Sequence, residues 1–400
     1  MLDAYIYEGL RTPFGRYGGA LAKIRPDDLL AYAIKAVLGK SKFKAEQLED
    51  IVVGCANQSG EDSRCVARHA GLAAGLPIEI PGTVLQRNCA SSLGALAHAA
   101  HSITAGEGDV FLVGGVESMS RAPFIFNKTD SPFGRDVQLA DSTIGPRFMN
   151  PRIIKLYGND QMPQTADNLA REFDIQRPDA DKFAAGSQQK YAKAKADGFY
   201  NGEISPVELP ATRKGPVPPV ADDEHPRPGT DVDTLAKMKP LYEGGVTTAG
   251  NASGVNDGAI AIMLASLGAG EKAGAKPIAR VIATAAAGVL PRIMGIGPVA
   301  ASKKVLARAG LAIKDMDVIE INEAFAVQVL ACLKGLGVAF DDSRVNPNGG
   351  AIAIGHPLGA SGLRIALTAS RQLARSGGRY ALVSLCIGGG QGMAVILERV

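Results

Sequence analysis

Residues 92–100 are SLGALAHAA, and residues 109–115, which follow shortly after, are DVFLVGG. The first stretch is rich in alanine and leucine, which favour helices, and the second is a mostly apolar run typical of a buried strand. The pattern returns near the carboxyl terminus, where residues 361–370 are SGLRIALTAS and residues 380–389 are YALVSLCIGG. A helix followed by a buried strand at both places indicates an internal repeat.

A second pair of segments extends this repeat. Residues 26–38 have apolar side chains at helical spacing and lead into a strand-like run at 47–54, and residues 298–310 lead into residues 316–322 in the same way. Strands and helices that alternate with short connections favour two similar α/β halves, each with a largely buried sheet and helices on its faces. A ligand cleft is expected between the halves.

The composition changes between the repeats. Residues 121–250 are rich in Pro, Asp, Lys and Arg, with helical patterns at 165–173 and 179–197. Repeated prolines at 213–229 fix φ and remove backbone donors, so no regular element is predicted there. We expect this region to be an inserted subdomain of loops that covers a ligand.

Composition excludes several classes of protein. With 400 residues, 46% of them hydrophobic, the chain is long enough for two or three lobes. The 43 basic and 40 acidic residues are too balanced for a nucleic-acid-binding protein, and no apolar run reaches the roughly eighteen residues of a membrane helix. The five irregularly spaced cysteines and the absence of a signal-peptide pattern predict a cytoplasmic protein with reduced thiols.

Two cysteines lie at positions that suit a catalytic residue, one before a helix and one at the end of a strand. Cys89 lies just before the helix-forming residues 92–100, a setting that lowers a thiol pKa, although a lone cysteine is often only a small buried side chain. Cys386 ends an apolar strand and precedes glycines 388–390, whose free amides suit an oxyanion. One thiol holding an acyl group while the other moves a proton is the arrangement that acyl transfer with carbon–carbon cleavage requires.

Two further polar residues are site candidates. His356 lies in the stretch GHPLGASG before a predicted helix, with a structural histidine as the alternative. Asn322 follows a strand end, where α/β proteins place site residues, with helix capping as the alternative. His98 and His101 are three apart on a predicted helix but lack a third ligand, so no metal site is predicted.

Together, these motifs resemble those of the thiolase family over essentially the whole chain. The matching stretches, in the family's order, are CASS at 89–92, GGVESMS at 114–120, TAGNASGVNDGA at 248–259, NEAF at 322–325, GHPLG at 355–359 and CIGGG at 386–390. The resemblance implies an α/β fold of two similar βαβαβαββ halves that form a layered α/β/α/β/α core, with a covering loop subdomain inserted in the first half. The implied domains are residues 1–120 plus 251–274, residues 121–250, and residues 275–400.

The resemblance also implies catalytic roles. Cys89 is the expected nucleophile that takes the acyl group, with His356 lowering its pKa and forming an oxyanion site together with a water held by Asn322. Cys386 is the expected acid/base for the departing acetyl-CoA enolate and the incoming CoA. The backbone N–H groups of Cys89 and Gly388 form a second oxyanion site. No metal or redox cofactor is implied, because the reaction is split through a thioester on the enzyme, and coenzyme A itself is a substrate.

Residues that contact the substrate follow from the same resemblance. Ser253 matches a residue at the pantetheine arm, and Met162 and Phe325 match residues near the acyl group. The residues that match the adenine end are Arg227, Thr234 and Met238. The expected partners are acyl-CoA and CoA, and the expected assembly is a homotetramer built from tight dimers.

Substrate preference is predicted from three stretches. Gln161 stands where members specialised for acetoacetyl-CoA usually carry histidine, and residues 54–62 and 141–151 resemble the 3-oxoadipyl-CoA thiolases of aromatic degradation. A dicarboxylic chain needs a cation at its far end, preferably a guanidinium. The candidates are Arg147 and its neighbours Arg121, Arg135 and Arg152. An arginine that pairs within the insertion is the structural alternative.

The predicted reaction is cleavage of 3-oxoadipyl-CoA by CoA to acetyl-CoA and succinyl-CoA. A broad-chain 3-oxoacyl-CoA thiolase of fatty-acid oxidation, an acetyl-CoA acetyltransferase and a noncatalytic acyl-CoA or lipid carrier remain as alternatives. Decarboxylating condensing enzymes have a related fold but carry histidine in place of the second cysteine, so Cys386 argues against them.

Overall fold

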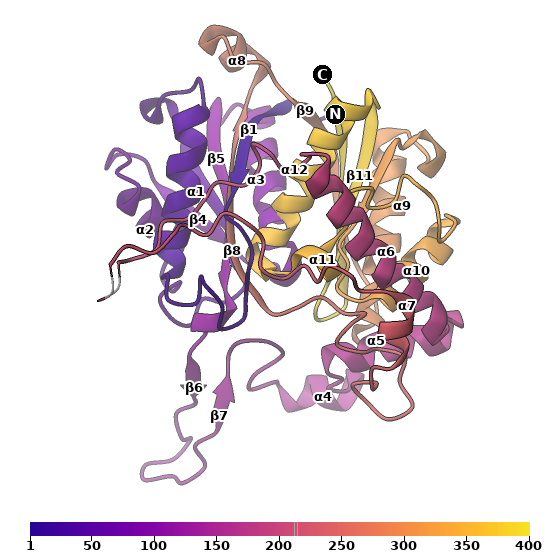
Figure 1. The fold of residues 1–400 in the computed structure, drawn as a ribbon. Helices are drawn as coiled ribbons and strands as arrows, with labels where there is room; N and C mark the ends of the chain where they lie inside the picture. Colours follow the sequence, from indigo (N-terminus) through magenta and orange to yellow (C-terminus); the bar gives the residue numbers. More distant parts are fainter. Residues whose placement is uncertain (212, 214) are drawn as a thin grey trace.

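Two similar half-sheets form the centre of the computed structural model, which describes residues 1–211, 213 and 215–400 (Figure 1). The strand order is β4-β3-β5-β8-β1 in the first half-sheet and β9-β12-β11-β10 in the second. The strands are β1 (Ala4–Arg11), β3 (Asp50–Gly54), β4 (Gly82–Leu85), β5 (Val110–Ser118), β8 (Asn256–Ala265), β9 (Ala279–Gly288), β10 (Val318–Ile321), β11 (Tyr380–Ile387) and β12 (Gln391–Arg399), and a short β2 (Gly15–Arg16) pairs with β8. Antiparallel pairing of residues 4–6 with residues 279–281 joins the two half-sheets.

The pairing pattern is the same in both halves. In the first half, β3 pairs parallel with β4 and β5, while β5 and β1 pair antiparallel with β8. In the second half, β10 pairs parallel with β11, and β12 pairs antiparallel with β11 and β9. A single parallel bridge between Ile319 and Val345 takes the place of β4. The predicted duplication is therefore confirmed.

Two buried helices separate the half-sheets. α3 (Ser91–Ala105) and α12 (Leu358–Ser376) pack on each other, and α12 contacts both β5 and β11. α1 (Pro26–Lys40) and α2 (Val66–Ala73) share a hydrophobic core with the outer face of the first half-sheet, and α9 (Gly297–Ala309) and α10 (Ala326–Leu336) share another with the second. The predicted order of layers, α/β/α/β/α, is thus present. Among the residues that the structure describes, no helix combines the length and apolar character needed to cross a membrane.

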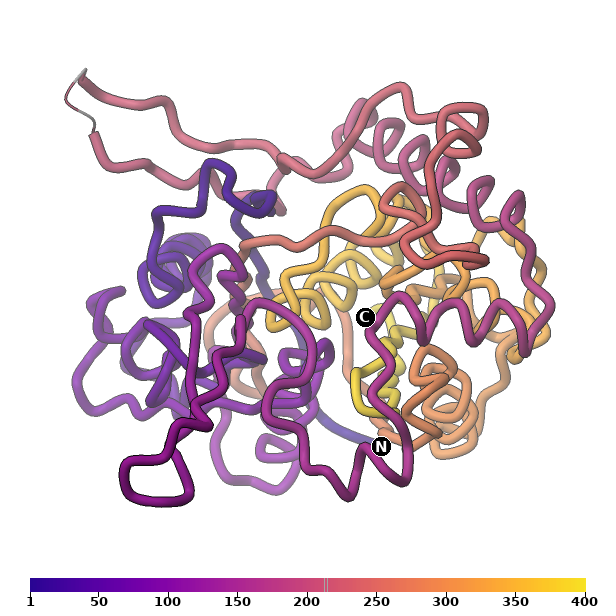
Figure 2. Tube along the Cα trace, turned by 90° about the horizontal axis from the view of Figure 1, so that it is seen from below, coloured from indigo at the N-terminus to yellow at the C-terminus, as the bar shows by residue number. Residues whose placement is uncertain are grey.

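The long connection between β5 and β8 holds the covering segment. Its elements are η3 (Met119–Arg121), β6 (Phe124–Phe126), β7 (Leu139–Asp141), α4 (Pro151–Tyr157), α5 (Met162–Phe173), α6 (Arg177–Ala196) and α7 (Val232–Ala236). The β6–β7 hairpin projects from the body (Figure 1), and the pink chain that follows α6 extends across the first half (Figure 2). The described residues of 213–229 form only isolated bridges, as their prolines predict. The domain boundaries remain a prediction.

The remaining elements are short connections. They are η1 (Ala45–Gln47), η2 (Asn88–Ala90), α8 (Leu267–Ala273), η4 (Pro291–Ile296), η5 (Ile313–Asp315) and α11 (Ala351–Ile354). Of these, η2 matters most for function, because it immediately precedes α3 and packs against α12.

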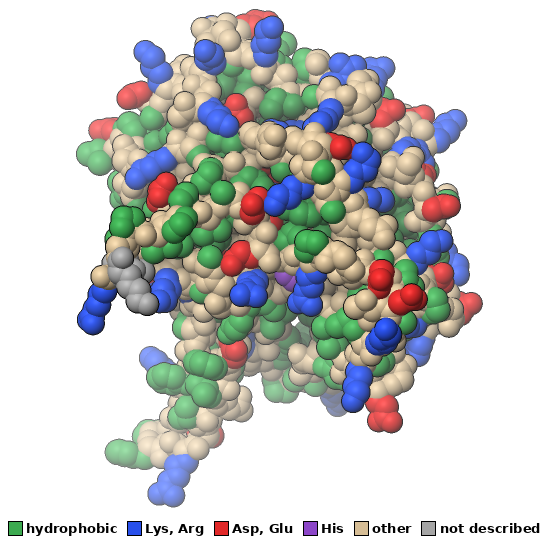
Figure 3. Space-filling view, viewed as in Figure 1, with side chains coloured by type: hydrophobic (Ala, Val, Ile, Leu, Met, Phe, Trp, Pro, Cys, Tyr) green, Lys and Arg blue, Asp and Glu red, His purple; other side chains and the backbone are tan. Residues whose placement is uncertain are grey.

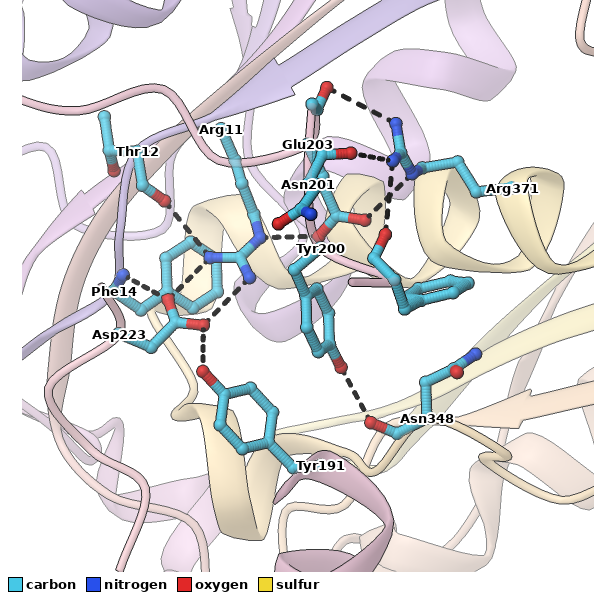
Figure 4. A network of polar contacts seen from close by, with 12 residues as sticks. Arg11, Thr12, Phe14, Tyr191, Tyr200, Asn201, Glu203, Asp223, Asn348 and Arg371 are labelled. Carbon is cyan, nitrogen blue, oxygen red and sulfur yellow. Dashed lines mark hydrogen bonds and ion pairs between the residues drawn. The ribbon is translucent and has the colours of Figure 1, made fainter. Parts of the chain in front are cut away.

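A buried ion-pair network fastens the covering segment to the core (Figure 4). Arg11, at the end of β1, bonds both oxygens of Asp223 at 2.6 and 2.9 Å, and its Nε donates to Glu203 at 2.7 Å. Tyr191 of α6 donates to Asp223, and Tyr200 donates to a carbonyl of the second half. Breaking such a buried pair typically costs about 3–5 kcal/mol. The network therefore holds the segment firmly across both halves.

Candidate active site

The two predicted cysteines meet between the halves. Cys89 lies in η2, one turn before α3, and the backbone N–H of Gly388 faces its thiol. Asn88 Nδ2 donates to the Gly388 carbonyl at 2.9 Å, which joins η2 to the turn after β11. Cys386 is the penultimate residue of β11 and lies close enough to Cys89 for the two sulfurs to interact electrostatically. Both cysteines are free thiols.

The expected low pKa of Cys89 is wrong for the resting site. Burial raises the pKa of the Cys89 thiol to about 11, although the N–H groups of Gly388 and of Cys89 itself act in the opposite direction. The carboxylate of Glu117 raises it further. Loss of solvation thus outweighs the helix start, although the Cys89 side chain is half-buried rather than fully buried. The thiol is neutral until a base removes its proton.

Cys386 lies in an apolar pocket. It shares a buried cluster with Phe325, Met294 and Ala324, and Met162 packs against that cluster. Burial raises the pKa of Cys386 well above its usual value, and the neighbouring Cys89 and Cys332 add to this effect. Cys386 is therefore a protonated thiol in a dry pocket, which suits a proton donor.

His356 is held in one orientation and one tautomer. Its backbone N–H donates to Asn256 Oδ1 at 2.8 Å, and Gly355 before it has a φ of +108°, which favours glycine. The ring Nδ1 lies 2.6 Å from Ser361 Oγ, whose hydroxyl donates to the Pro357 carbonyl at 2.9 Å. Because that hydroxyl proton is used, Ser361 accepts from Nδ1–H, and Nε2 is left free to take a proton.

The charge of His356 follows from its surroundings. Burial, followed by the positive charge of Arg364, lowers the pKa of His356 to about 3. The imidazole is therefore neutral at physiological pH, with an unprotonated Nε2. Sequence analysis missed Ser361 as the partner of the ring, although its position five residues after His356, on the first turn of the predicted helix, was an available signal.

Asn322 lies beside the imidazole. Its Nδ2 is 3.4 Å from Nε2 and 3.5 Å from Nδ1 of His356. Its Oδ1 is buried and has no hydrogen-bond partner among the described residues. The helix-capping alternative is wrong, because the residue that caps α10 is Phe325. Because Oδ1 is an acceptor without a partner, it can accept a hydrogen bond from a water molecule.

The predicted residues near the acyl group lie together. Ala252 forms a bridge with Phe325, and the backbone N–H of Ser253 donates to the Ala324 carbonyl at 2.9 Å. Ser253 is therefore adjacent to the apolar cluster that includes Cys386. Met162, at the start of α5, lies 3.7 Å from the point where a side chain on Gly388 would begin. The Met162 sulfur is therefore within van der Waals reach of Gly388.

The residues predicted for the adenine end lie farther out on the covering segment. Arg227 and Thr234 are exposed, and Met238 is partly buried against Gly250. Arg177 of α6 holds this part of the segment, because its Nη2 donates to the carbonyls of Leu235 and Met238. None of the three predicted residues has a contact with the cysteines among the described interactions.

The candidate arginines differ in the hydrogen bonds and ion pairs that their side chains already form. Arg147 Nη1 donates to the Ser142 carbonyl at 2.6 Å, a contact within the insertion. Gly145, two residues earlier, approaches the Gln161 side chain, which brings this loop next to the start of α5. Arg121 is paired with Glu61 at 2.5 Å and is less available. No side-chain partner is recorded for Arg135 or Arg152 in the described part of the chain.

One cluster of metal-ligand residue types occurs among the described residues. Single ligand atoms of Cys55, Asp62 and Glu117 lie within 4.8 Å of one another. Both oxygens of Glu117 accept backbone N–H groups, and the Cys55 thiol donates to the Asn57 carbonyl. Because these atoms are engaged within the protein, we assign no ion to the cluster. His98 and His101 are both exposed.

Comparisons with known proteins agree with this geometry. Family models of the thiolase N-terminal and C-terminal domains match residues 4–267 and 275–399. The chain is 53% identical to a beta-ketoadipyl-CoA thiolase of Acinetobacter baylyi and 54% identical to a 3-oxoadipyl-CoA/3-oxo-5,6-dehydrosuberyl-CoA thiolase of Escherichia coli, each over 100% of both chains. The human mitochondrial 3-ketoacyl-CoA thiolase in complex with CoA superposes with a TM-score of 0.90 at 40% identity, covering 100% of this chain and 98% of that one. The chain belongs to the thiolase family.

Proposed function

We propose that this chain is an acyltransferase that cleaves 3-oxoadipyl-CoA with CoA to give acetyl-CoA and succinyl-CoA. The observation that supports this most strongly is the pairing of two thiols from different halves, Cys89 and Cys386. The neutral imidazole of His356 lies just before α12, the helix that packs against α3 and η2. The names of the bacterial relatives, which are more than half identical over their full length, support the choice of acyl chain.

In the first half-reaction, His356 Nε2 takes the proton of Cys89 as the sulfur attacks the 3-oxo carbon of the substrate. His356 and a water on Asn322 stabilise one oxyanion, and the N–H groups of Cys89 and Gly388 stabilise the other. The bond between carbons 2 and 3 then breaks. The acyl group remains as a thioester on Cys89, and the acetyl-CoA enolate takes its proton from Cys386.

In the second half-reaction, the Cys386 thiolate takes the proton of an incoming CoA thiol. The CoA sulfur attacks the thioester, and Cys89 leaves and regains its proton from His356. Each side chain ends in the protonation state in which it began. Only acyl groups and protons move, so the mechanism needs no metal or redox cofactor.

Substrate contacts complete the proposal. Ser253 lies beside the acyl pocket and would meet the pantetheine arm, while the outer residues Arg227, Thr234 and Met238 would meet the adenine end. Met162 and Phe325 would line the acyl chain. The division into two halves (residues 1–120 plus 251–274, and residues 275–400) around a covering segment at 121–250 fits this reading. The free thiols fit a cytoplasmic location.

Arg147 is our candidate for the distal carboxylate. Its loop approaches Gln161, the residue before Met162, so Arg147 belongs to a segment that lies next to the start of α5. We expect R147A to raise KM for 3-oxoadipyl-CoA at least tenfold, roughly the value of one charge-assisted bond. Cleavage of an unbranched medium-chain substrate should change little. K155A, which removes an exposed cation of α4 that is not a candidate, serves as the matched control. An R147A variant with the parental KM would remove the assignment.

A substrate panel tests the function itself. We expect free CoA and 3-oxoadipyl-CoA to give acetyl-CoA with a higher kcat/KM than an unbranched medium-chain 3-oxoacyl-CoA or acetoacetyl-CoA. Faster cleavage of the medium chain would indicate a thiolase of fatty-acid oxidation. Binding of CoA esters without any acetyl-CoA would indicate a carrier.

We also propose association into a homotetramer through the β6–β7 hairpin. The hairpin exposes apolar side chains, with Phe124 at 69%, Phe126 at 72% and Phe133 at 101%, and green side chains mark the projecting arm in Figure 3. Apolar groups gathered on a projecting arm are typical of a protein–protein contact. Replacing Phe126 and Phe133 with serine should reduce the mass measured by light scattering. An unchanged mass would exclude the hairpin from the contact.

A further inference from the structure

Glu117 is a buried carboxylate that the proposed mechanism does not use. It lies near the end of β5, within the motif GGVESMS, and is 1% exposed. An ionised carboxylate in the interior is unfavourable unless it is well hydrogen-bonded. A buried carboxylate within electrostatic reach of Cys89 therefore indicates a specific structural role.

Three backbone N–H groups, two from a loop and one from the start of a helix, donate to this carboxylate. Oε1 accepts from Asn57 at 2.9 Å, and Oε2 accepts from Ala56 at 3.0 Å and from Gly359 at 2.8 Å. Ala56 and Asn57 lie in the loop after β3, and Gly359 is the second residue of α12. One side chain thus ties the first half of the molecule to the start of the helix that follows His356.

The junction at Gly359 is packed too closely to shift freely. A Cβ on Gly359 would lie 2.1 Å from the Val116 carbonyl and 2.9 Å from the Gly54 carbonyl. The start of α12 therefore lies directly against β5 and β3. A negative charge at a helix start is also favourable, because the free N–H groups there carry partial positive charge.

The carboxylate is also within electrostatic reach of the nucleophile. Burial raises the pKa of Glu117 to about 7 against the effect of its three N–H donors, and Asp62 raises it further. Its negative charge in turn raises the pKa values of Cys89 and Cys55. Asp62, Cys55 and Cys89 are the titratable groups with recorded effects on or from Glu117 in the described part of the chain.

We propose that Glu117 is a positioning residue that fixes the start of α12, and with it His356, relative to Cys89. It acts through Gly359, three residues after His356, while η2 with Cys89 packs against the same helix. The inference rests on the proposed function for the role of His356. Glu117 would align His356 with Cys89 without touching the substrate.

The test is E117Q, in which one acceptor oxygen becomes an amide that cannot accept. We expect a folded protein whose kcat falls at least tenfold while KM stays within twofold, because substrate contacts are untouched. Alkylation of Cys89 by iodoacetamide, followed by peptide mass, supplies a second readout. Loss of the negative charge should lower the midpoint of its pH profile by roughly one unit. Unchanged kcat or an unmoved midpoint would overturn the proposal.

Two further variants complete the design. The control variant E320Q removes a carboxyl group on β10 that is as buried as that of Glu117 but has no hydrogen bond among the described residues. The kcat of E320Q at pH 7 should stay within twofold of the parent value. E117D keeps the charge but draws the oxygens back from Gly359, so kcat should fall while the alkylation midpoint stays. If E117Q does not fold, the kcat of E117D becomes the test. A kcat equal to that of the parent enzyme would then overturn the proposal. Alkylation needs no substrate, so failure of the proposed function would be seen separately, as a parent enzyme that cleaves no 3-oxoacyl-CoA.

Discussion

α3 and α12 occupy equivalent places in the two halves, and both are buried between the half-sheets. They differ in what precedes them, because η2 brings Cys89 to the start of α3 while a glycine–histidine–proline turn brings His356 to the start of α12. Duplication supplies two helix starts that lie close together. In the mechanism we propose, divergence at those starts gives one half the nucleophile and the other half the base.

The strands that follow these helices differ in the same way. β5 leads into the long covering segment, whereas β11 turns through Gly388 to Gly390 directly into β12. The tight turn points the Gly388 N–H at Cys89 and keeps Cys386 beside it. In the proposed mechanism, the second half therefore supplies most of the catalytic groups, and the first half supplies the nucleophile and the covering segment.

Removal of the nucleophile should have the largest effect. We expect C89S to lower kcat by roughly 10³-fold or more, since no other group can hold the acyl chain. The variant should still bind CoA esters, which calorimetry measures. Substantial turnover by C89S would show that the first half does not supply the nucleophile.

Loss of the second thiol comes next. C386S should lower kcat by roughly 10² to 10⁴-fold, the usual contribution of a positioned acid or base. Iodoacetamide should still alkylate Cys89 in this variant. C332S is the matched control, because Cys332 is equally buried and its thiol donates to the Gly295 carbonyl, a bond that serine retains. Equal losses in both variants would mean that packing, not proton transfer, explains the effect.

Loss of the Ser361 hydroxyl, which bonds the His356 ring, should lower kcat less than loss of either thiol. S361A leaves Nδ1 of His356 without its acceptor, so the ring is free to turn or change tautomer. A loss of roughly 10 to 100-fold in kcat is expected, as when other functional histidines lose the group that orients them. Steady-state kinetics across pH 6–9 measure it. S370A, on the same helix, removes a buried hydroxyl that bonds only the Ala366 carbonyl and should be near parental.

The smallest effect concerns stability and contrasts two buried carboxyl groups. Glu117 has three donors, whereas Glu320 has none recorded, and burial raises the pKa of Glu320 to about 8 despite Arg364. The pKa of Glu320 is about 8 in the folded protein and 4.5 is its ordinary value, so the folded protein binds more protons than the unfolded protein between these pH values. The free energy of unfolding that Glu320 contributes is therefore present below about pH 4.5 and lost as the pH rises to about 8. E320Q should unfold at a temperature higher than the parent by ~2 °C at pH 8.5 and nearly equal at pH 5. Calorimetry giving the same difference at both pH values would contradict the assignment.

Much of this architecture follows from the sequence. The helix-then-strand pattern at 92–115 and 361–389 predicts the duplication, because buried elements must be apolar on all sides and leave a plain signal. Motifs at helix starts and strand ends predict which residues lie together between the halves. Cys89, Cys386 and Gly388 prove to be neighbours even though nearly 300 residues separate Cys89 from the other two.

Other features depend on tertiary contacts that no local pattern reveals. The pKa of Cys89 rises because several segments exclude water from it, and a helix start alone predicted the opposite direction. The bonds of Glu117 join three segments that are distant in sequence. The Arg11 network likewise depends on Asp223, 212 residues away. Such effects become visible only once the chain is folded.

The most direct test is to trap the acyl-enzyme. The enzyme is mixed with 3-oxoadipyl-CoA in the absence of free CoA, and acetyl-CoA and protein mass are followed together. The account predicts one acetyl-CoA per active site and a succinyl group that peptide mapping places on Cys89, released as succinyl-CoA when CoA is added. Production of acetyl-CoA with the acyl group on another residue, or with none on the protein, would contradict it.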